Sequence, residues 1–334
     1  MVNKIILLIS IIAFLFSTSK ILAQSTNNVE SYPSVQLSNG TLDVLVFVPD
    51  KDKGYYRSVR FEWSGFMAQV TYKGHTFFQD PYYQDDGGPV PVKHDPLNTG
   101  CGTGIAEEFR NPLGYETAAA GEPFLKIGVG LLEKSDSKPY FFAEPYKIIK
   151  PGEWKVTHGQ DWILFEQSIS TGFGYAYQYS KKISLAPGQP EITVLHILKN
   201  TGTKMIASNP YCHNFFCFDK NPAGPDYAFQ FTVPIVTIDS FKDKAVINGN
   251  SFRLLKYLAG SDPVGGAINI GKRNEFLVSN SKSGTKVFVK GDNPLSSFYI
   301  YIWKPGYCPE PMIDIKIEPG AKQEWTNHYR FEVD

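Results

Sequence analysis

A histidine and a glutamate, far apart in the sequence, have the residue types and surroundings that acid/base chemistry requires. His213 lies in the aromatic stretch YCHNFFCFD, and its imidazole can give or take a proton near neutral pH. If this stretch is a strand, then Tyr211, His213, Phe215 and Cys217 share one face. Such a face suits the wall of a pocket in which a sugar ring stacks on aromatic side chains. A core histidine bonded to the backbone would give the same pattern, so both interpretations stay open.

Glu310 stands between two prolines in the segment YCPEPM near the end of the chain. Because proline has no N–H group to donate to a sheet ladder, its neighbours predict that Glu310 lies in an irregular segment that leads into the next strand. A carboxylate held on a rigid loop is well suited to acid/base chemistry. We therefore treat His213 and Glu310 as the candidate catalytic residues.

Six further side chains are candidates for binding the hydroxyl groups or the apolar face of a sugar. If the chain at Glu107 and Glu108 is extended, these two carboxylates point to opposite faces, and one of them can receive sugar hydroxyls. Each of the six also has a purely structural interpretation, such as a surface ion pair, an exposed loop, a Gly-Pro-Asp turn or core packing. The candidates are Arg60, His94, Glu107, Glu108, Asp226 and Trp303.

Composition and turn signals predict an all-β chain. The sequence has 24 Phe and 19 Tyr, its 29 Gly and 23 Pro separate short segments, and helical periodicity is scarce outside a turn or short helix in residues 251–259. Regularly spaced short strands, beginning with a hairpin at the Asn39-Gly40 turn, favour a large antiparallel β-sandwich. Residues 55–78 are predicted to form three strands. Residues 79–115 are predicted to be a long irregular region of the kind that builds binding sites.

The N-terminus indicates export. Lys4, the apolar residues 5–16 and Ala23 are typical of a secretory signal peptide in residues 1–23. Residues 24–334 are then expected to form a single domain of a periplasmic or secreted protein, without a stable membrane span after cleavage. Lysine plus arginine and aspartate plus glutamate number 33 each, so the chain lacks the basic field that nucleic acids require. The oligomeric state stays open.

The sequence has four cysteines, whose state depends on whether the chain is exported. An even number in an exported chain is compatible with two disulfides, and buried free thiols are equally compatible. Their spacing lacks the close Cys-x-x-Cys pair typical of zinc sites. The four are Cys101, Cys212, Cys217 and Cys308.

Several motifs in the C-terminal half resemble the galactose mutarotase (aldose 1-epimerase) superfamily. They are CHNFF with His213, CPEP with Glu310, the turn at residues 319–320 and the aromatic segment 325–331. The resemblance implies the galactose mutarotase-like supersandwich and the interconversion of sugar anomers without a metal or cofactor. It further implies that Glu310 takes a proton from the anomeric hydroxyl while His213, as the imidazolium, protonates the ring oxygen.

The resemblance also directs attention to the middle of the predicted irregular region. Many superfamily members carry a sugar-binding histidine there, whereas the alignable segment TGIAEEFRN offers Thr103 and Glu107. His94 precedes that segment and is a candidate substitute for the missing histidine. This departure leaves the identity of the sugar open.

Two alternatives belong to other functional classes. A glycoside hydrolase or polysaccharide lyase on the same fold could pair Glu310 with Glu107 or Glu108, because glycoside hydrolysis generally uses two carboxyl groups. A non-catalytic carbohydrate-binding protein would need only the aromatic wall. Each alternative still expects a monosaccharide or a glycan as the partner.

Overall fold

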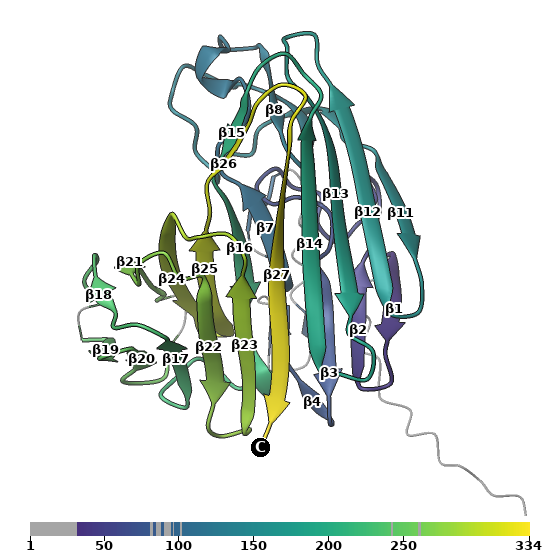
Figure 1. The fold of residues 1–334 in the computed structure, drawn as a ribbon. Helices are drawn as coiled ribbons and strands as arrows, with labels where there is room; N and C mark the ends of the chain where they lie inside the picture. The colour runs from purple at the N-terminus through teal and green to yellow at the C-terminus, as the bar shows by residue number, and fades with distance from the viewer. Residues whose placement is uncertain are drawn as a thin grey trace, which may run out of the picture. The chain divides into compact units, whose positions relative to one another are not determined.

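The computed structural model describes residues 32–334, apart from 81–82, 85–87, 90–94, 96, 101, 242 and 260–261. Tyr32–Asp334 forms one unit by its internal contacts. The described chain consists of antiparallel strands and two short 3₁₀ turns, η1 (Tyr115–Thr117) and η2 (Phe218–Lys220), which confirms the predicted all-β antiparallel fold (Figure 1). No helix of the described part is long and apolar enough to cross a membrane. The predicted signal peptide lies outside the described residues.

The larger of the two main sheets has ten strands, in the order β11-β12-β13-β14-β27-β23-β22-β17-β20-β19 (Figure 1). Its long strands alternate buried and more exposed residues, as expected of a sheet with one face on the core. Their bounds are β11 Trp154–His158, β12 Trp162–Ser170, β13 Ala176–Leu185, β14 Glu191–Asn200, β27 Lys322–Val333, β23 Thr285–Gly291, β22 Glu275–Asn280, β17 Tyr227–Phe231, β20 Ser251–Leu254 and β19 Ala245–Asn248.

The second main sheet has six strands in the order β18-β21-β24-β25-β16-β7. Every residue of its neighbouring strands β25, β16 and β7 is buried, so protein covers both of their faces. The bounds are β18 Val236–Thr237, β21 Val264–Asn269, β24 Ser297–Trp303, β25 Gly306–Met312, β16 Pro210–Phe215 and β7 Gly104–Phe109.

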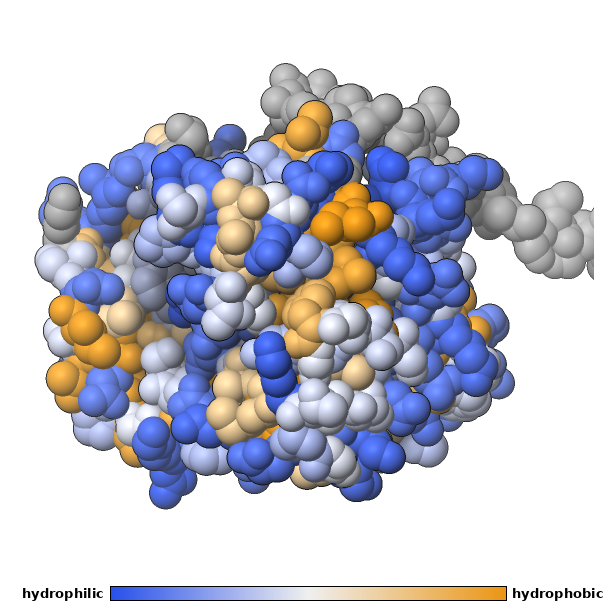
Figure 2. All heavy atoms as spheres, turned by 90° about the horizontal axis from the view of Figure 1, so that it is seen from above, coloured by the Kyte–Doolittle hydropathy of each residue, from blue (hydrophilic) through white to orange (hydrophobic). Residues whose placement is uncertain are grey.

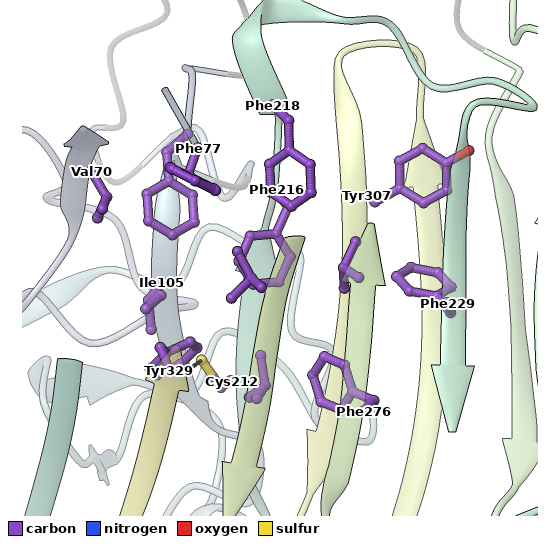
Figure 3. Packing of buried hydrophobic residues seen from close by; sticks show 14 of the residues in the cluster. Val70, Phe77, Ile105, Cys212, Phe216, Phe218, Phe229, Phe276, Tyr307 and Tyr329 are labelled. Carbon is purple, nitrogen blue, oxygen red and sulfur yellow. Dashed lines mark hydrogen bonds between the residues drawn. The ribbon is translucent and has the colours of Figure 1, made fainter. Parts of the chain in front are cut away.

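Side chains of the two main sheets meet in one apolar layer (Figure 3). The ring of Tyr227 on β17 stacks on that of Tyr307 on β25, with centroids 4.3 Å apart. The hydroxyl of Tyr329 on β27 lies 3.4 Å from the thiol of Cys212 on β16, and the two side chains are neighbours in Figure 3. We call the face of the six-stranded sheet that carries Cys212 and Tyr307 its inner face, and the opposite face its outer face.

Four small sheets complete the fold. The predicted hairpin at Asn39-Gly40 is confirmed, and Gly40 takes the left-handed φ of 81° that such a turn requires. The strands are β1 Ser34–Ser38, β2 Leu42–Phe47, β3 Met67–Tyr72 and β4 His75–Thr76 in one sheet, β8 Pro123–Lys126, β9 Gly130–Glu133 and β10 Ile148–Pro151 in another, and the pairs β5 Tyr83–Gln84 with β6 Gly88–Pro89 and β15 Ile206–Ser208 with β26 Ile315–Ile317.

Three local predictions were wrong. Residues 55–64 form mostly bends rather than a strand, and residues 251–259 hold the strand β20 followed by bends rather than the predicted turn or short helix. The predicted irregular region contains β7, a strand that lies at the edge of the six-stranded sheet beside β16. Its glycine, Gly104, has a φ of 66° and lies where a Cβ atom would be 2.0 Å from the carbonyl oxygen of Met67. Glycine and glutamate are uncommon in strands. Pairing with β16, which is distant in sequence, therefore determines that this segment is a strand, and local propensity does not.

The cysteines do not form two disulfides. Among the described residues, no bridge joins any two of Cys212, Cys217 and Cys308, which are all buried. Two disulfides among four cysteines would need one bridge within this set of three. Cys101 lies outside the described residues.

Candidate active site

The aromatic strand β16 carries the candidate catalytic histidine, and its faces alternate as predicted. Cys212 and Phe216 belong to the core between the main sheets, whereas Tyr211 and Phe215 belong to a separate cluster on the outer face. His213 shares that outer face, and its ring stacks parallel to that of Phe215 with centroids 6.0 Å apart. The sequence pattern therefore placed His213 on the correct face.

Glu310 lies within strand β25 rather than in an irregular segment, which corrects the prediction made from its flanking prolines. Tyr307 donates its N–H group to Phe216, directly after β16, and Ile313 donates to Pro210 of β16. By strand alternation, Pro309 and Pro311 therefore face this same neighbour. The ladder is interrupted there, and the Asn214 side-chain amide donates to the Pro309 carbonyl at 3.0 Å. Because both prolines face the interrupted side, β25 keeps its pairing with β24.

The two candidate catalytic side chains meet on the outer face. The His213 Nε2 atom lies 3.5 Å from the Glu310 Oε1 atom. The two residues are only 1% and 6% exposed, so both ionisable groups are largely removed from water. Burial raises the pKa of Glu310 to about 7, although the charge of Arg60 opposes the shift. Burial and Arg60 together lower the pKa of His213 well below its ordinary value.

Arg60 extends toward the His213–Glu310 pair from the irregular segment that covers the outer face. Its Nε donates to Glu108 Oε2 at 3.0 Å, and its Nη2 donates to the Tyr211 hydroxyl at 2.7 Å. The opposite oxygen of Glu108 accepts from the buried Lys126 at 3.2 Å. Burial by itself would raise the pKa of Glu108, but Lys126 and Arg60 outweigh burial and lower it. Glu108 is thus a fixed carboxylate that orients Arg60.

These residues line a cavity of about 730 Å³, a size typical of small-molecule sites. Strand β24 supplies one wall of aromatic rings, because Tyr299, Tyr301 and Trp303 alternate with core residues and all project from the outer face. Their rings provide apolar surfaces of the kind on which sugars stack. The lining residues are Arg60, Gly100, Glu108, Arg110, Phe142, Tyr211, His213, Tyr299, Tyr301, Trp303, Glu310 and Met312.

Glu107 points away from this cavity, as expected of the residue next to Glu108 on a strand. It pairs with Cys212 in the β7–β16 register and therefore faces inward. There its Oε1 lies 2.6 Å from His196 Nε2, and its Oε2 forms an ion pair with Lys181, which also binds Glu62. Glu107 therefore does not line this cavity, and its candidate role in substrate binding stays a prediction.

Asp226, another candidate for substrate binding, does not line this cavity either. Its carboxylate accepts a hydrogen bond from the exposed Tyr257, and its carbonyl accepts from Ser281. Neither contact lies on the outer-face cavity, and Asp226 is absent from the cavity's lining. His94 lies outside the described residues, so its proposed role stays a prediction.

One group of side chains has the donor types of a metal site. The ligand atoms of His213, Cys308 and Glu310 all lie within 4.8 Å of one another, and the Cys308 thiol is 3.7 Å from Glu310 Oε1. Nitrogen, sulfur and oxygen in this arrangement suit zinc. Cys308 and Glu310 share one face of β25 because they are two residues apart, whereas His213 joins them only through the packing of β16 beside β25, which the sequence spacing does not reveal.

Sequence reasoning missed several members of the site. The alternation in FYIYIW could have placed Tyr299 and Tyr301 beside Trp303 on one face. Lys126 and Phe142 had no comparable signal, because they come from segments outside the six-stranded sheet.

Comparison with known proteins bears on the fold. No protein-family model matches the sequence, and no curated protein matches it. Solved structures do match. A protein described as a candidate aldose 1-epimerase from Escherichia coli K12 has a TM-score of 0.54 at 15% identity, over 90% of this chain and 99% of that one.

Two galactose mutarotase-like proteins give similar values. That from Clostridium acetobutylicum has a TM-score of 0.52 at 14% identity, over 90% of this chain and 95% of that one. That from Lactobacillus casei has a TM-score of 0.51 at 12% identity, over 90% of this chain and 100% of that one.

This chain has the galactose mutarotase-like fold. In this galactose mutarotase-like chain, the outer face of the six-stranded sheet brings together four of the predicted site residues around Glu310. They are His213, Arg60, Glu108 and Trp303.

Proposed function

We propose that the protein is an aldose 1-epimerase-like enzyme that interconverts the anomers of a sugar. The observation that carries the proposal is the approach of His213 Nε2 to within 3.5 Å of Glu310 Oε1 in a cavity lined with aromatic rings. The galactose mutarotase-like fold adds support by analogy only.

The proposed reaction needs two proton transfers at neighbouring oxygens. Glu310 takes the proton of the anomeric hydroxyl, His213 gives a proton to the ring oxygen, and the bond between that oxygen and the anomeric carbon breaks. The open-chain aldehyde then rotates, and the reverse transfers close the ring on either face. Because both oxygens are attached to the same carbon, a donor and an acceptor 3.5 Å apart can serve them together.

The proton balance of the pair sets its pH dependence. The reaction requires one proton on the pair, carried by His213 at the start and by Glu310 after the transfer. In the free site the shifted pKa values favour this proton on Glu310, because its pKa is about 7 and that of His213 is well below its ordinary value. Whichever residue holds it first, the active form carries one proton in total.

Arg60 and the aromatic wall are proposed to hold the sugar. The Arg60 guanidinium is fixed by Glu108 and Tyr211 and is positioned for hydrogen bonds to hydroxyl oxygens. Trp303 would cover an apolar face of the ring.

A hydrolase that uses two carboxyl groups finds less support in this geometry. Glu107 faces the opposite side of its strand, and both oxygens of Glu108 are engaged by cations. Glu310 is therefore the carboxyl group of the cavity with the raised pKa that proton transfer requires.

Export is part of the same proposal. Cleavage after Ala23 would release a mature chain that begins at Gln24 into the periplasm or medium. Mass spectrometry of the protein recovered from those fractions tests this, and a retained N-terminus would refute it.

The reaction is tested by following freshly dissolved α-glucose and α-galactose by NMR. The wild type should accelerate relaxation of at least one sugar, and His213→Ala and Glu310→Gln should each lower the catalysed rate by about 100-fold or more. Matched controls are His158→Ala and Glu166→Gln, which change an exposed strand histidine and a surface glutamate. Retained activity in Glu310→Gln, or absence of any acceleration, would overturn the proposal.

A further inference from the structure

A second cavity of about 630 Å³ adjoins the candidate active site. Three residues, Glu108, Arg110 and Phe142, line both cavities. The second cavity is otherwise built by the turn between β7 and β8, the segment before β10 and residues near β13 and β15. These elements lie at the upper end of Figure 1, and Figure 2 shows that end as mostly hydrophilic with separate hydrophobic groups.

The walls of the second cavity have the mixed chemistry of a sugar site. Tyr140 and Tyr175 supply aromatic rings, and Phe142 adds a third where the cavities join. The Asn111 amide can donate hydrogen bonds to hydroxyl groups or accept them, and the Glu116 carboxylate can accept them.

A buried polar network forms the wall that the cavities share. Glu108 binds Arg60 on the side of the first cavity and Lys126 through its other oxygen. Lys126 in turn donates to the Tyr140 hydroxyl at 2.8 Å, and Tyr140 lines the second cavity. This network gives the two cavities a common rigid boundary.

Phe142 joins the cavities on their open side. Its ring centroid lies 4.3 Å from the Arg60 guanidinium carbon, and the side chain is 37% exposed. Arg110 lies beside it in both linings, with Nη1 3.3 Å from the Met312 sulfur. A ligand longer than one sugar ring that occupied both cavities would have to lie along these two side chains, because both belong to the two linings.

We propose that the second cavity binds the adjoining sugar unit of a reducing disaccharide or oligosaccharide, whose reducing-end unit occupies the first cavity. This inference rests on the proposed function, because the anomeric carbon that reacts is the free one at the reducing end. A linked chain cannot extend from that carbon, so the added unit extends from another hydroxyl toward Arg110 and Phe142. The preferred substrate class is thus a reducing glycan fragment rather than a free monosaccharide.

The test compares glucose with cellobiose, maltose and lactose, which all have glucose at the reducing end. Affinity is measured by calorimetric titration of the full mature protein, and anomer relaxation is measured separately by NMR. At least one disaccharide should bind at least tenfold more tightly than glucose, which corresponds to about 1.4 kcal/mol. Tyr175→Ala should lower the affinity for that disaccharide by a factor at least five times larger than the factor for glucose. The control is Tyr257→Ala, at an exposed tyrosine outside both linings, which should leave both affinities unchanged.

The two readouts separate this inference from the proposed function. The second sugar site would be overturned by equal affinities for glucose and every disaccharide, or by no binding of any probe. It would also be overturned if Tyr175→Ala lowered the affinities for glucose and the disaccharide equally. In that event, accelerated mutarotation of glucose would still support the proposed epimerase activity. Conversely, selective disaccharide binding with no accelerated relaxation would support the second site and refute the epimerase.

Discussion

Glu310 on β25 and His213 on β16 lie with Oε1 and Nε2 3.5 Å apart, at the place where prolines interrupt the ladder between their strands. The interruption removes backbone pairing where the two side chains meet. Their burial shifts the pKa of the acid upward and that of the imidazole downward. The pair therefore retains one shared proton near neutral pH, and this property underlies the first prediction.

Activity is expected to fall as the pH rises above about 7. The folded pKa of Glu310 is about 7 and that of His213 lies well below 6.5, so above pH 7 the free pair loses its single proton. The pH profile of kcat/KM, corrected for spontaneous relaxation, should decline about tenfold per pH unit on this side. A rate that instead rose between pH 7 and 9 would indicate a lone base without an acid partner.

Arg60→Lys is expected to weaken sugar binding and shift the alkaline limb of the pH profile upward. Lysine cannot reproduce the two directed contacts to Glu108 and Tyr211. Arg60 lowers the pKa of Glu310, so moving its charge away lets that pKa rise. The measurement is KM together with the pH profile. Arg57→Lys is the control, because Arg57 contacts the Asp52 carbonyl instead, and equal effects in both variants would refute the assignment.

Glu107→Gln is expected to destabilise the fold while leaving the outer-face cavity intact. Its carboxylate bridges the buried Lys181 and His196 side chains, and the neutral amide removes the negative charge that both of them face, although Lys181 keeps its ion pair with Glu62. The cost should be about 3 kcal/mol of unfolding free energy. Chemical denaturation measures it, with Glu166→Gln as the control for an exposed ion pair, where less than about 1 kcal/mol is expected. Equal losses in the two variants would contradict the structural role.

Chelation with EDTA is expected to leave the activity unchanged, whereas added Zn²⁺ should inhibit. The donor atoms of His213, Cys308 and Glu310 can hold zinc, and bound zinc would block the proton transfers. Cys308→Ala should require a higher zinc concentration for half inhibition. Activity that disappears with EDTA and returns with zinc would show instead that a metal takes part in the reaction.

The sequence by itself determined the features that depend on neighbouring residues. Strand alternation placed His213 on one face and Cys212 on the other, and the Asn39-Gly40 turn specified a hairpin. Both follow from local backbone geometry, which fixes side-chain direction and turn type within a few residues. The all-β class followed from aromatic composition and turn spacing in the same way.

Only the tertiary structure decided which strands pair and which carboxylate reaches the cavity. Flanking prolines suggested a loop at Glu310, but sheet pairing through β24 keeps that residue in a strand. The register of β7 on β16 directs Glu108 outward and Glu107 inward, a choice that a shift of one residue would reverse. Hydrogen bonds between segments distant in sequence set these relationships, and local pattern carries no information about such partners.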